Sequence, residues 1–141
     1  MKAIVAQTEQ ELKDAYYVRR TVFVEEQNVP EELEVDQYEQ DCAHIVLYDD
    51  QSRPVGAGRY RPFADYGKVE RVCILKSSRK GGAGKLVMDK MEEHAISQKA
   101  PALKLNSQTH AIPFYEKLGY EIVSEEFMDA GIPHRTMMKR L

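Results

Sequence analysis

The residues most able to carry chemistry form a basic, glycine-rich run from Ser77 to Lys85. The apolar segment Val69–Leu75 precedes it and a stretch with helical periodicity follows, so a strand, a tight turn and a helix start are predicted. The first turn of a helix presents unpaired N–H groups and the positive end of its dipole. Glycines let that backbone approach a ligand closely. This combination predicts a site for a phosphate or pyrophosphate.

Three kinds of glycine-rich loop bind such groups. They can be distinguished by the residue types that each requires at particular positions. A P-loop would need Gly at position 79 and Ser or Thr at position 86, where the chain has Arg79 and Leu86. A dinucleotide-binding turn would need Gly at position 87, which is Val87. The pattern Arg79-x-x-Gly82-x-Gly84 remains. It resembles the Arg/Gln-x-x-Gly-x-Gly/Ala signature of the GNAT N-acetyltransferase superfamily, in which this loop binds the pyrophosphate of acetyl-CoA.

A second pattern downstream strengthens the resemblance. The predicted strand Ala102–Asn106 is followed by Gln108-x-x-Ala111-x-x-x-Tyr115-x-x-x-Gly119-Tyr120. This resembles the family's second signature, with Gln108 where Asn is usual. The resemblance extends over most of the chain. Two further segments, Val22–Gln27 and Gly131–His134, resemble a small bacterial branch that is ElaA-like or YjcF-like.

The resemblance implies acetyl-CoA as co-substrate, with no metal. It gives the end of the predicted strand Lys68–Leu75 the role of pairing with the pantetheine arm and of donating a backbone N–H to the acetyl oxygen. The predicted cofactor-binding residues are Val72, Cys73, Ile74, Arg79, Lys80, Gly81, Gly82, Ala83, Gly84, Lys85, Gln108 and Tyr115.

Tyr115 is the candidate general acid. It matches the family tyrosine that protonates the departing CoA thiolate, and a phenol is neutral at pH 7 and more acidic than an alcohol. The alternative is a tyrosine that packs in an aromatic cluster with Phe114 and Tyr120.

Glu70 is the candidate base that takes the amine proton, directly or through a water. Regular strand alternation would place its carboxylate on the same face as Val72 and Ile74. His44 and His134 are alternatives, because histidine titrates near neutral pH, and some family members deprotonate through water alone. Arg59 and Arg61 share a strand and meet either an acidic acceptor group or solvent.

Composition sets the limits of the assignment. The chain has 141 residues, 43% hydrophobic and 30% charged, which fits one soluble domain over residues 1–141. The apolar stretches are strand-length and the N-terminus does not resemble a signal peptide, so we expect a cytoplasmic protein without a membrane partner.

Cys42 and Cys73 are expected to be reduced, and the four histidines show no metal-ligand spacing. A net charge of −3 argues against nucleic-acid binding.

The charge is unevenly distributed along the chain. The segment Glu25–Asp41 holds eight acids and no Lys or Arg, while the rest is basic. In the family the first helices wall the acceptor side of the cleft. An acidic wall would attract a cationic amine, so a positively charged small-molecule acceptor is expected; the alternative is a solvated helix surface.

Hydrophobic periodicity and turn residues give the element order. Strands are predicted at 2–7, 43–49, 54–62, 68–75, 102–106, 120–126 and 136–139, and helices at 8–24, 82–98 and 111–118, with a short helix in the acidic segment. This order matches the α/β (α+β) GNAT-like acyl-CoA N-acyltransferase fold, a mixed central sheet of about six to seven strands flanked by helices and split to admit the cofactor arm.

The leading functional hypothesis is an acetyl-CoA-dependent N-acetyltransferase that acts on a primary amine. A non-catalytic acyl-CoA-binding sensor would keep Arg79–Gly84 but has no need of Tyr115 and Glu70, which are present. A lysine or N-terminal acetyltransferase of proteins is a further alternative. The sequence leaves open the acceptor and the oligomeric state, with a homodimer among the options.

Overall fold

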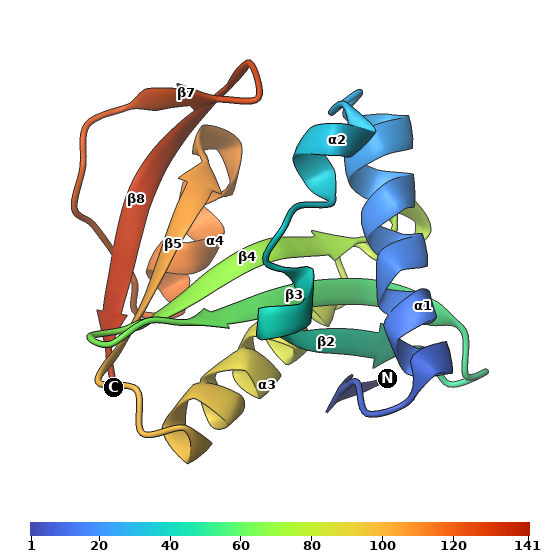
Figure 1. Cartoon of the computed structure of the whole chain (residues 1–141). Coiled ribbons are helices and arrows are strands. Elements are labelled where there is room, and N and C mark those ends of the chain that lie inside the picture. The colour runs from blue at the N-terminus through green and yellow to red at the C-terminus, as the bar shows by residue number, and fades with distance from the viewer.

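The computed structural model describes residues 1–141 and is built around one eight-stranded mixed sheet (Figure 1). The strand order is β1-β2-β3-β4-β5-β8-β6, and β7 pairs with β8. All neighbours are antiparallel except β4 and β5. The strands are β1 (Lys2–Val5), β2 (Ala43–Tyr48), β3 (Pro54–Pro62), β4 (Gly67–Ile74), β5 (Ala102–Gln108), β6 (Glu121–Ile122), β7 (Phe127–Asp129) and β8 (Ile132–Arg140).

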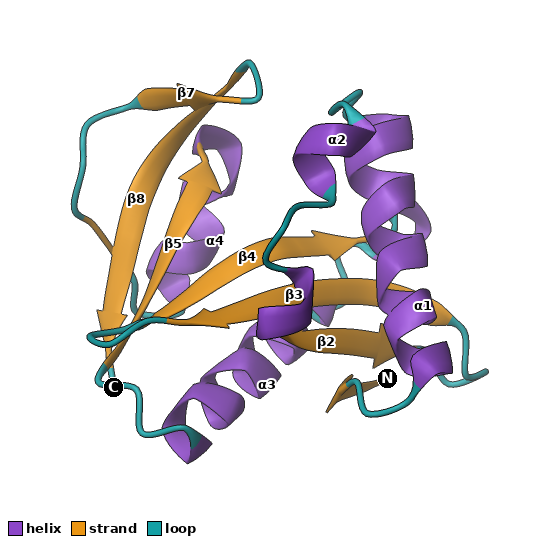
Figure 2. Cartoon of the chain, viewed as in Figure 1, coloured by secondary structure: helices purple, strands orange, loops and turns teal.

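Helices cover both faces of this sheet (Figure 2). On one side lie α1 (Glu9–Arg19), a π-helical turn (Arg20–Glu26) and α2 (Glu31–Glu34); on the other lie α3 (Ala83–Ser97) and α4 (Ile112–Lys117). Short 3₁₀ turns occupy 39–41, 76–78 and 109–111. All of the helices are too short or too polar to serve as membrane spans.

The sequence explains where α1 begins and where its geometry changes. The Thr8 hydroxyl accepts a hydrogen bond from the backbone N–H of Glu11, and the Glu11 carboxylate accepts one from the backbone N–H of Thr8, which is the predicted capping box. The helix was expected to run to about position 24, but it is α-helical only to Arg19 and continues as a π turn. Such turns are often found at functional sites.

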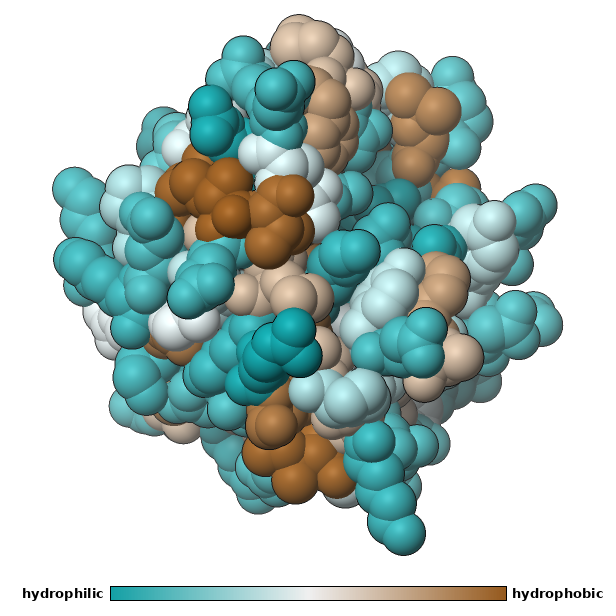
Figure 3. All heavy atoms as spheres, turned by 90° about the vertical axis from the view of Figure 1, so that its left-hand side faces the viewer, coloured by the Kyte–Doolittle hydropathy of each residue, from teal (hydrophilic) through white to brown (hydrophobic).

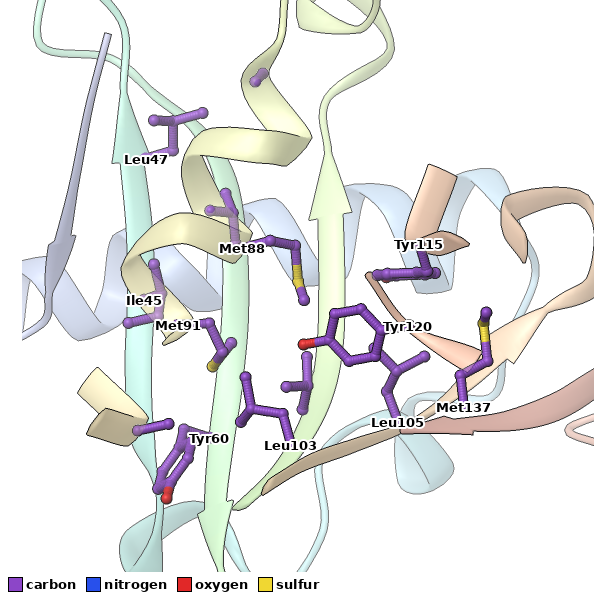
Figure 4. Close-up of a cluster of buried hydrophobic side chains, with 14 of the residues drawn as sticks. Ile45, Leu47, Tyr60, Met88, Met91, Leu103, Leu105, Tyr115, Tyr120 and Met137 are labelled. Atoms are coloured by element: carbon purple, nitrogen blue, oxygen red, sulfur yellow. The ribbon is translucent and has the colours of Figure 1, made fainter. Parts of the chain in front are cut away.

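The core divides into two clusters, one on each face of the sheet. The larger cluster lies under α3 and α4 and includes Leu103, Leu105 and Met137 beside Tyr115 and Tyr120 (Figure 4). The smaller cluster lies under α1 and contains Ala15, Val18, Val22, Val46, Ala57 and Cys73. Cys73 is a free thiol in this core, as expected, and Cys42 is also unpaired.

The sheet opens between β4 and β5. Their parallel pairing is limited to Gly67–Val69 against Leu103–Leu105, after which the two strands diverge (Figure 1). The register of β3 on β4 shifts between Ala57 and Arg59, opposite Arg71, which has φ 57°. This is a β-bulge in β4 at the point where the sheet splits.

The last strands differ from the prediction. One strand was expected at 120–126, but only β6 is extended there, and β7 follows beyond it, so the sheet has eight strands. The ladder breaks because the Ser124 hydroxyl, rather than a backbone carbonyl, accepts the N–H of Thr136. Seen from the β8 side, the surface is mainly hydrophilic with separate apolar patches (Figure 3).

Candidate active site

A cleft of about 880 Å³ lies where β4 and β5 diverge. One wall comes from the π turn and α2, and the opposite wall from β5, α4 and the β7–β8 turn. Most of the predicted site residues meet here: Glu70, Val72, Cys73, Ile74, Arg79, Lys80, Gly84, Gln108 and Tyr115 line it. The other four predicted loop residues, Gly81, Gly82, Ala83 and Lys85, do not line the cleft.

The floor of the cleft is a strand edge without a neighbouring strand. Beyond Val69, β4 pairs only with β3, so its other edge faces the opening. Backbone N–H and C=O groups on such an edge need partners, and an extended ligand with amide groups can supply them. Val72 and Ile74 lie on this part of β4, which fits the predicted role in holding a pantetheine arm.

Two residues of the predicted phosphate loop have a left-handed backbone, and only one of them is a glycine. Gly82 is in the left-handed region at φ 78°, immediately before α3, and Lys80 has φ 73°. A Cβ at Gly81 or Gly82 would meet no atom within 4 Å, so the loop leaves open space there. At Gly84 a Cβ would lie 3.0 Å from Phe114 Cζ, so this glycine allows α3 to pack on α4. The α3 N-terminus is therefore open to an anion.

Arg79 is already engaged within the protein. Its guanidinium makes two hydrogen bonds to the Glu26 carboxylate, at 2.7 and 2.8 Å, and Nε donates to the Ile74 carbonyl at 2.9 Å. The predicted contact of Arg79 with phosphate would therefore require Glu26 to move. The Lys85 ammonium is paired with Asp89 at 2.7 Å. The free groups of the loop are its backbone N–H donors and Lys80.

A polar bridge links the cleft walls near the end of β5. Gln108 donates from Nε2 to Gln27 Oε1 at 3.0 Å, and its own Oε1 lies 2.7 Å from His110 Nε2. The sequence analysis did not indicate either contact. Gln27 is 81 positions from Gln108, and His110 is two positions from it. Gln108 thus holds the segment after α1 against β5.

Tyr115 lies at the cleft in the predicted aromatic cluster. Its ring packs edge-on against Phe114, with the ring centroids 5.0 Å apart. It also packs edge-on against Tyr120, with the centroids 5.8 Å apart (Figure 4). Burial raises the pKa of Tyr115 above its ordinary value, with Cys73 adding to the effect. The hydroxyl is therefore protonated throughout the neutral range, as a proton donor must be. Both the packing role and the acid role are compatible with this placement.

Glu70 lies in the cleft, but not on the face expected. The bulge at Arg71 interrupts strand alternation, so Glu70 joins Arg59 on the α1/α2 face, whereas Val72 packs towards α3. The predicted common face with Val72 is therefore wrong. Glu70 Oε1 accepts a hydrogen bond from Arg59 at 2.9 Å, while Oε2 accepts none. Oε2 is the atom that could take a proton.

Of the two histidines considered as alternative bases, only one lines the cleft. His44 is buried away from the cleft, with Nε2 2.9 Å from the Glu39 carbonyl, and burial lowers its pKa. His134 does line the cleft, stacked on Phe127. Its Nδ1 lies 2.7 Å from the Ile132 carbonyl, which places the proton on Nδ1 and leaves Nε2 as an acceptor.

A buried ion network supports the α2 side of the cleft. Five bases and four acids are connected by ion pairs, and sequence spacing did not indicate this network. Its members are Arg19, Arg59, Lys68, Arg61 and Arg71 with Glu34, Asp36, Glu39 and Glu70. Arg59 is fully buried between Asp36, Glu39 and Glu70, so it is not free to meet an acceptor.

The network also changes the electrostatics expected of the acidic segment. Five of its eight acids are paired with arginines: Glu26, Glu31, Glu34, Asp36 and Glu39. Arg59 and Arg19 lower the pKa values of Asp36 and Glu39 to about 2, although burial acts in the opposite direction. These carboxylates are charged but paired, so five of the eight acids of the segment have their charge compensated by arginines.

Comparison with known proteins identifies the family to which this arrangement is similar. A model of the acetyltransferase (GNAT) domain matches residues 4–141. The uncharacterised N-acetyltransferase YjcF of Bacillus subtilis is 54% identical over 140 residues, which is 99% of each chain.

Solved structures have the same fold. A structure from Lactobacillus plantarum superposes with a TM-score of 0.92 at 30% identity, covering 99% of this chain and 97% of that one. Escherichia coli ElaA superposes with a TM-score of 0.85 at 22% identity, with coverage of 99% and 97%. The overall fold is therefore a recurring one.

Proposed function

Because the chain belongs to the GNAT family and is an N-acetyltransferase, we propose that it moves an acetyl group from acetyl-CoA to the primary amine of a small molecule. The observation that carries this proposal is the cleft at the split between β4 and β5. It brings the phosphate loop, an unpaired strand edge and Tyr115 together. A sensor protein would need the first two features but not a protonated phenol at the thioester.

In the proposed mechanism the neutral amine attacks the thioester carbonyl directly. A C–N bond forms, the C–S bond breaks and the electron pair leaves on sulfur as thiolate. The backbone of β4 near Val72 holds the acetyl oxygen, and Tyr115 gives its proton to the thiolate. Glu70 Oε2, on the α1/α2 side, takes the amine proton; His134 Nε2 is the second candidate for that step.

Release of free CoA against a panel of amines tests the function. We expect acetyl-CoA turnover above the rate without amine for at least one small primary amine, with the acetylated product identified by mass. The cationic acceptors expected from the sequence, such as polyamines and amino sugars, form one arm of the panel, and lysine peptides form another. Tight acetyl-CoA binding with no CoA release for any amine would support the sensor alternative instead.

A further inference from the structure

The acceptor side of the cleft is more basic than the sequence suggested. Four basic side chains lie on it or beside it: Arg61, Lys68 and Arg71 line the cleft, and Lys104 is the register neighbour of Lys68 on β5. In the ion network the bases outnumber the acids by five to four. The surplus positive charge lies at the cleft end, because Arg19 and Arg59 are enclosed by carboxylates.

Arg61 is held in place by aromatic rings, but its hydrogen-bonding capacity is not fully used. Its guanidinium carbon lies 4.0 Å from the Tyr38 ring centroid and 4.9 Å from that of Phe63. The nearest carboxylate oxygen, Glu70 Oε1, is 3.6 Å from Nε, and Nε is buried without a hydrogen-bond partner. Stacking on aromatic rings orients a guanidinium, and its planar fork matches a carboxylate or phosphate.

Lys68 offers a second cation beside Arg61, and its ion pair with Glu70 is long. The two residues are opposite each other in the β3–β4 ladder, so their side chains share a face. The Lys68 ammonium lies 3.5 Å from Glu70 Oε2 and makes no hydrogen bond, and the side chain is 24% exposed. An oxyanion in the cleft would meet the outer nitrogens of the Arg61 guanidinium and the Lys68 ammonium together, and hydrogen bonds between charged groups are the stronger ones.

We therefore propose that the acceptor is an amine that also carries an oxyanion, and that Arg61 and Lys68 bind this oxyanion. The inference rests on the proposed function and specifies its substrate class. Glu70 lies between these cations and Val72, so the amine faces the thioester while the acid group extends along β4. The Lys68 ammonium lies 3.5 Å from Glu70 Oε2, the atom proposed to take the amine proton, so only a few bonds separate the two groups of the acceptor.

Matched acceptors that differ only at one end test the inference. The compounds are 4-aminobutyrate, 4-aminobutyramide and putrescine, with phosphoethanolamine against ethanolamine to separate phosphate from carboxylate. We expect kcat/KM for CoA release to be at least about tenfold higher for an oxyanion-bearing amine than for its neutral or cationic partner. Binding of each compound to CoA-saturated protein by calorimetry should follow the same order, with the phosphate loop already filled.

Variants show whether the named residues cause the preference. Arg61→Gln and Lys68→Gln should remove most of the preference, measured within each variant as the ratio of kcat/KM for the oxyanion-bearing amine to kcat/KM for its neutral partner. Arg61→Lys keeps the positive charge but loses the planar guanidinium. Its preference for oxyanion-bearing amines should therefore lie between that of wild type and that of Arg61→Gln. The control is Arg53→Gln, an exposed arginine in the β2–β3 turn, 71% exposed, which should change nothing. Melting temperatures confirm that each variant is folded.

The outcomes separate the two proposals. If no amine releases CoA, the proposed function fails, and calorimetry with the same compounds still decides the binding inference. Equal or stronger binding of putrescine than of 4-aminobutyrate, or no binding of any oxyanion-bearing amine, would overturn the inference. So would a preference that survives in both Arg61→Gln and Lys68→Gln.

Discussion

Tyr115 is the residue for which we propose a role in both packing and chemistry. Its ring is part of the larger core cluster, and its side chain lines the cleft. Burial raises its pKa, so it holds its proton at any pH near neutrality. A donor of this kind releases its proton only when a strong base, such as a departing thiolate, forms beside it.

Replacing Tyr115 by Phe removes the hydroxyl and keeps the ring. We expect kcat to fall by about 10²-fold while acetyl-CoA affinity stays unchanged, because a positioned acid contributes of that order. Steady-state kinetics and calorimetry measure the two quantities. Tyr120→Phe is the control, because Tyr120 is an equally buried neighbour that does not line the cleft. A Tyr115→Phe variant within about threefold of wild type would leave only the packing role.

Glu70 shows that the regular alternation of side chains along a strand can fail to predict which face of the sheet a residue occupies. Alternation along β4 predicted a common face with Val72, and the bulge at Arg71 reversed it. The sequence carries no sign of this bulge, because Arg is not a residue that favours φ 57°. Only the mismatch in register between β3 and β4 reveals it.

Among the elements, the loop before α3 was the most predictable from sequence. Its glycines, its position after a strand and the helix start all follow from local rules, and α3 begins within a residue of the expected position. The engagement of Arg79 with Glu26 was not predictable, because these residues are 53 positions apart. The conformation of the loop thus follows from nearby residues. Which of its hydrogen-bond donors stay free depends on Glu26 in the π turn, which engages Arg79.

Gly82→Ala tests the loop. Alanine strains the left-handed conformation at φ 78° and places a methyl group in the open space expected to hold the pyrophosphate. We expect acetyl-CoA affinity to fall by about tenfold or more. Gly131→Ala is the matched control, since Gly131 has φ 75°, a Cβ there also meets nothing within 4 Å, and it lies in the β7–β8 turn.

The control also separates strain from ligand contact. If the two variants lose similar stability in thermal melts but only Gly82→Ala loses acetyl-CoA affinity in calorimetry, the loop contact explains the effect. Equal affinities in both variants would contradict the assignment of the pyrophosphate to this loop. Gly84→Val is a poorer test, because its side chain would collide with Phe114.

At the scale of the whole molecule, the fold and the cleft were predictable, while the electrostatics were not. Periodicity and turn residues gave the helices and most strands, and two signatures gave the cleft. The acidic segment looked like a free acidic wall because sequence shows charges but not their partners. In the structure α1, β3 and β4 supply the arginines that neutralise Glu34, Asp36 and Glu39.

This network should make stability depend on pH in the acid range. The ordinary pKa of Glu39 is 4.5, and although burial raises it, hydrogen bonds from Arg19 lower it to about 2. A carboxylate whose pKa is lower in the folded state stabilises that state above its ordinary pKa, and the stabilisation is lost as the pH falls towards about 2. Asp36 behaves in the same way.

Glu39→Gln should therefore lower the free energy of unfolding at pH 7 by about 3–5 kcal/mol, since it leaves Arg19 and Arg59 buried with one partner fewer. It should also flatten the loss of stability between pH 5 and pH 3. Glu31→Gln is the control, because its pair with Arg20 is over half exposed and should contribute at most about 1 kcal/mol. Urea unfolding across this pH range measures both effects, and parallel pH curves for wild type and Glu39→Gln would refute the role of the network. A loss at Glu39 as small as that at Glu31 would mean that water screens the cluster, and the surplus charge beside Arg61 would be screened with it.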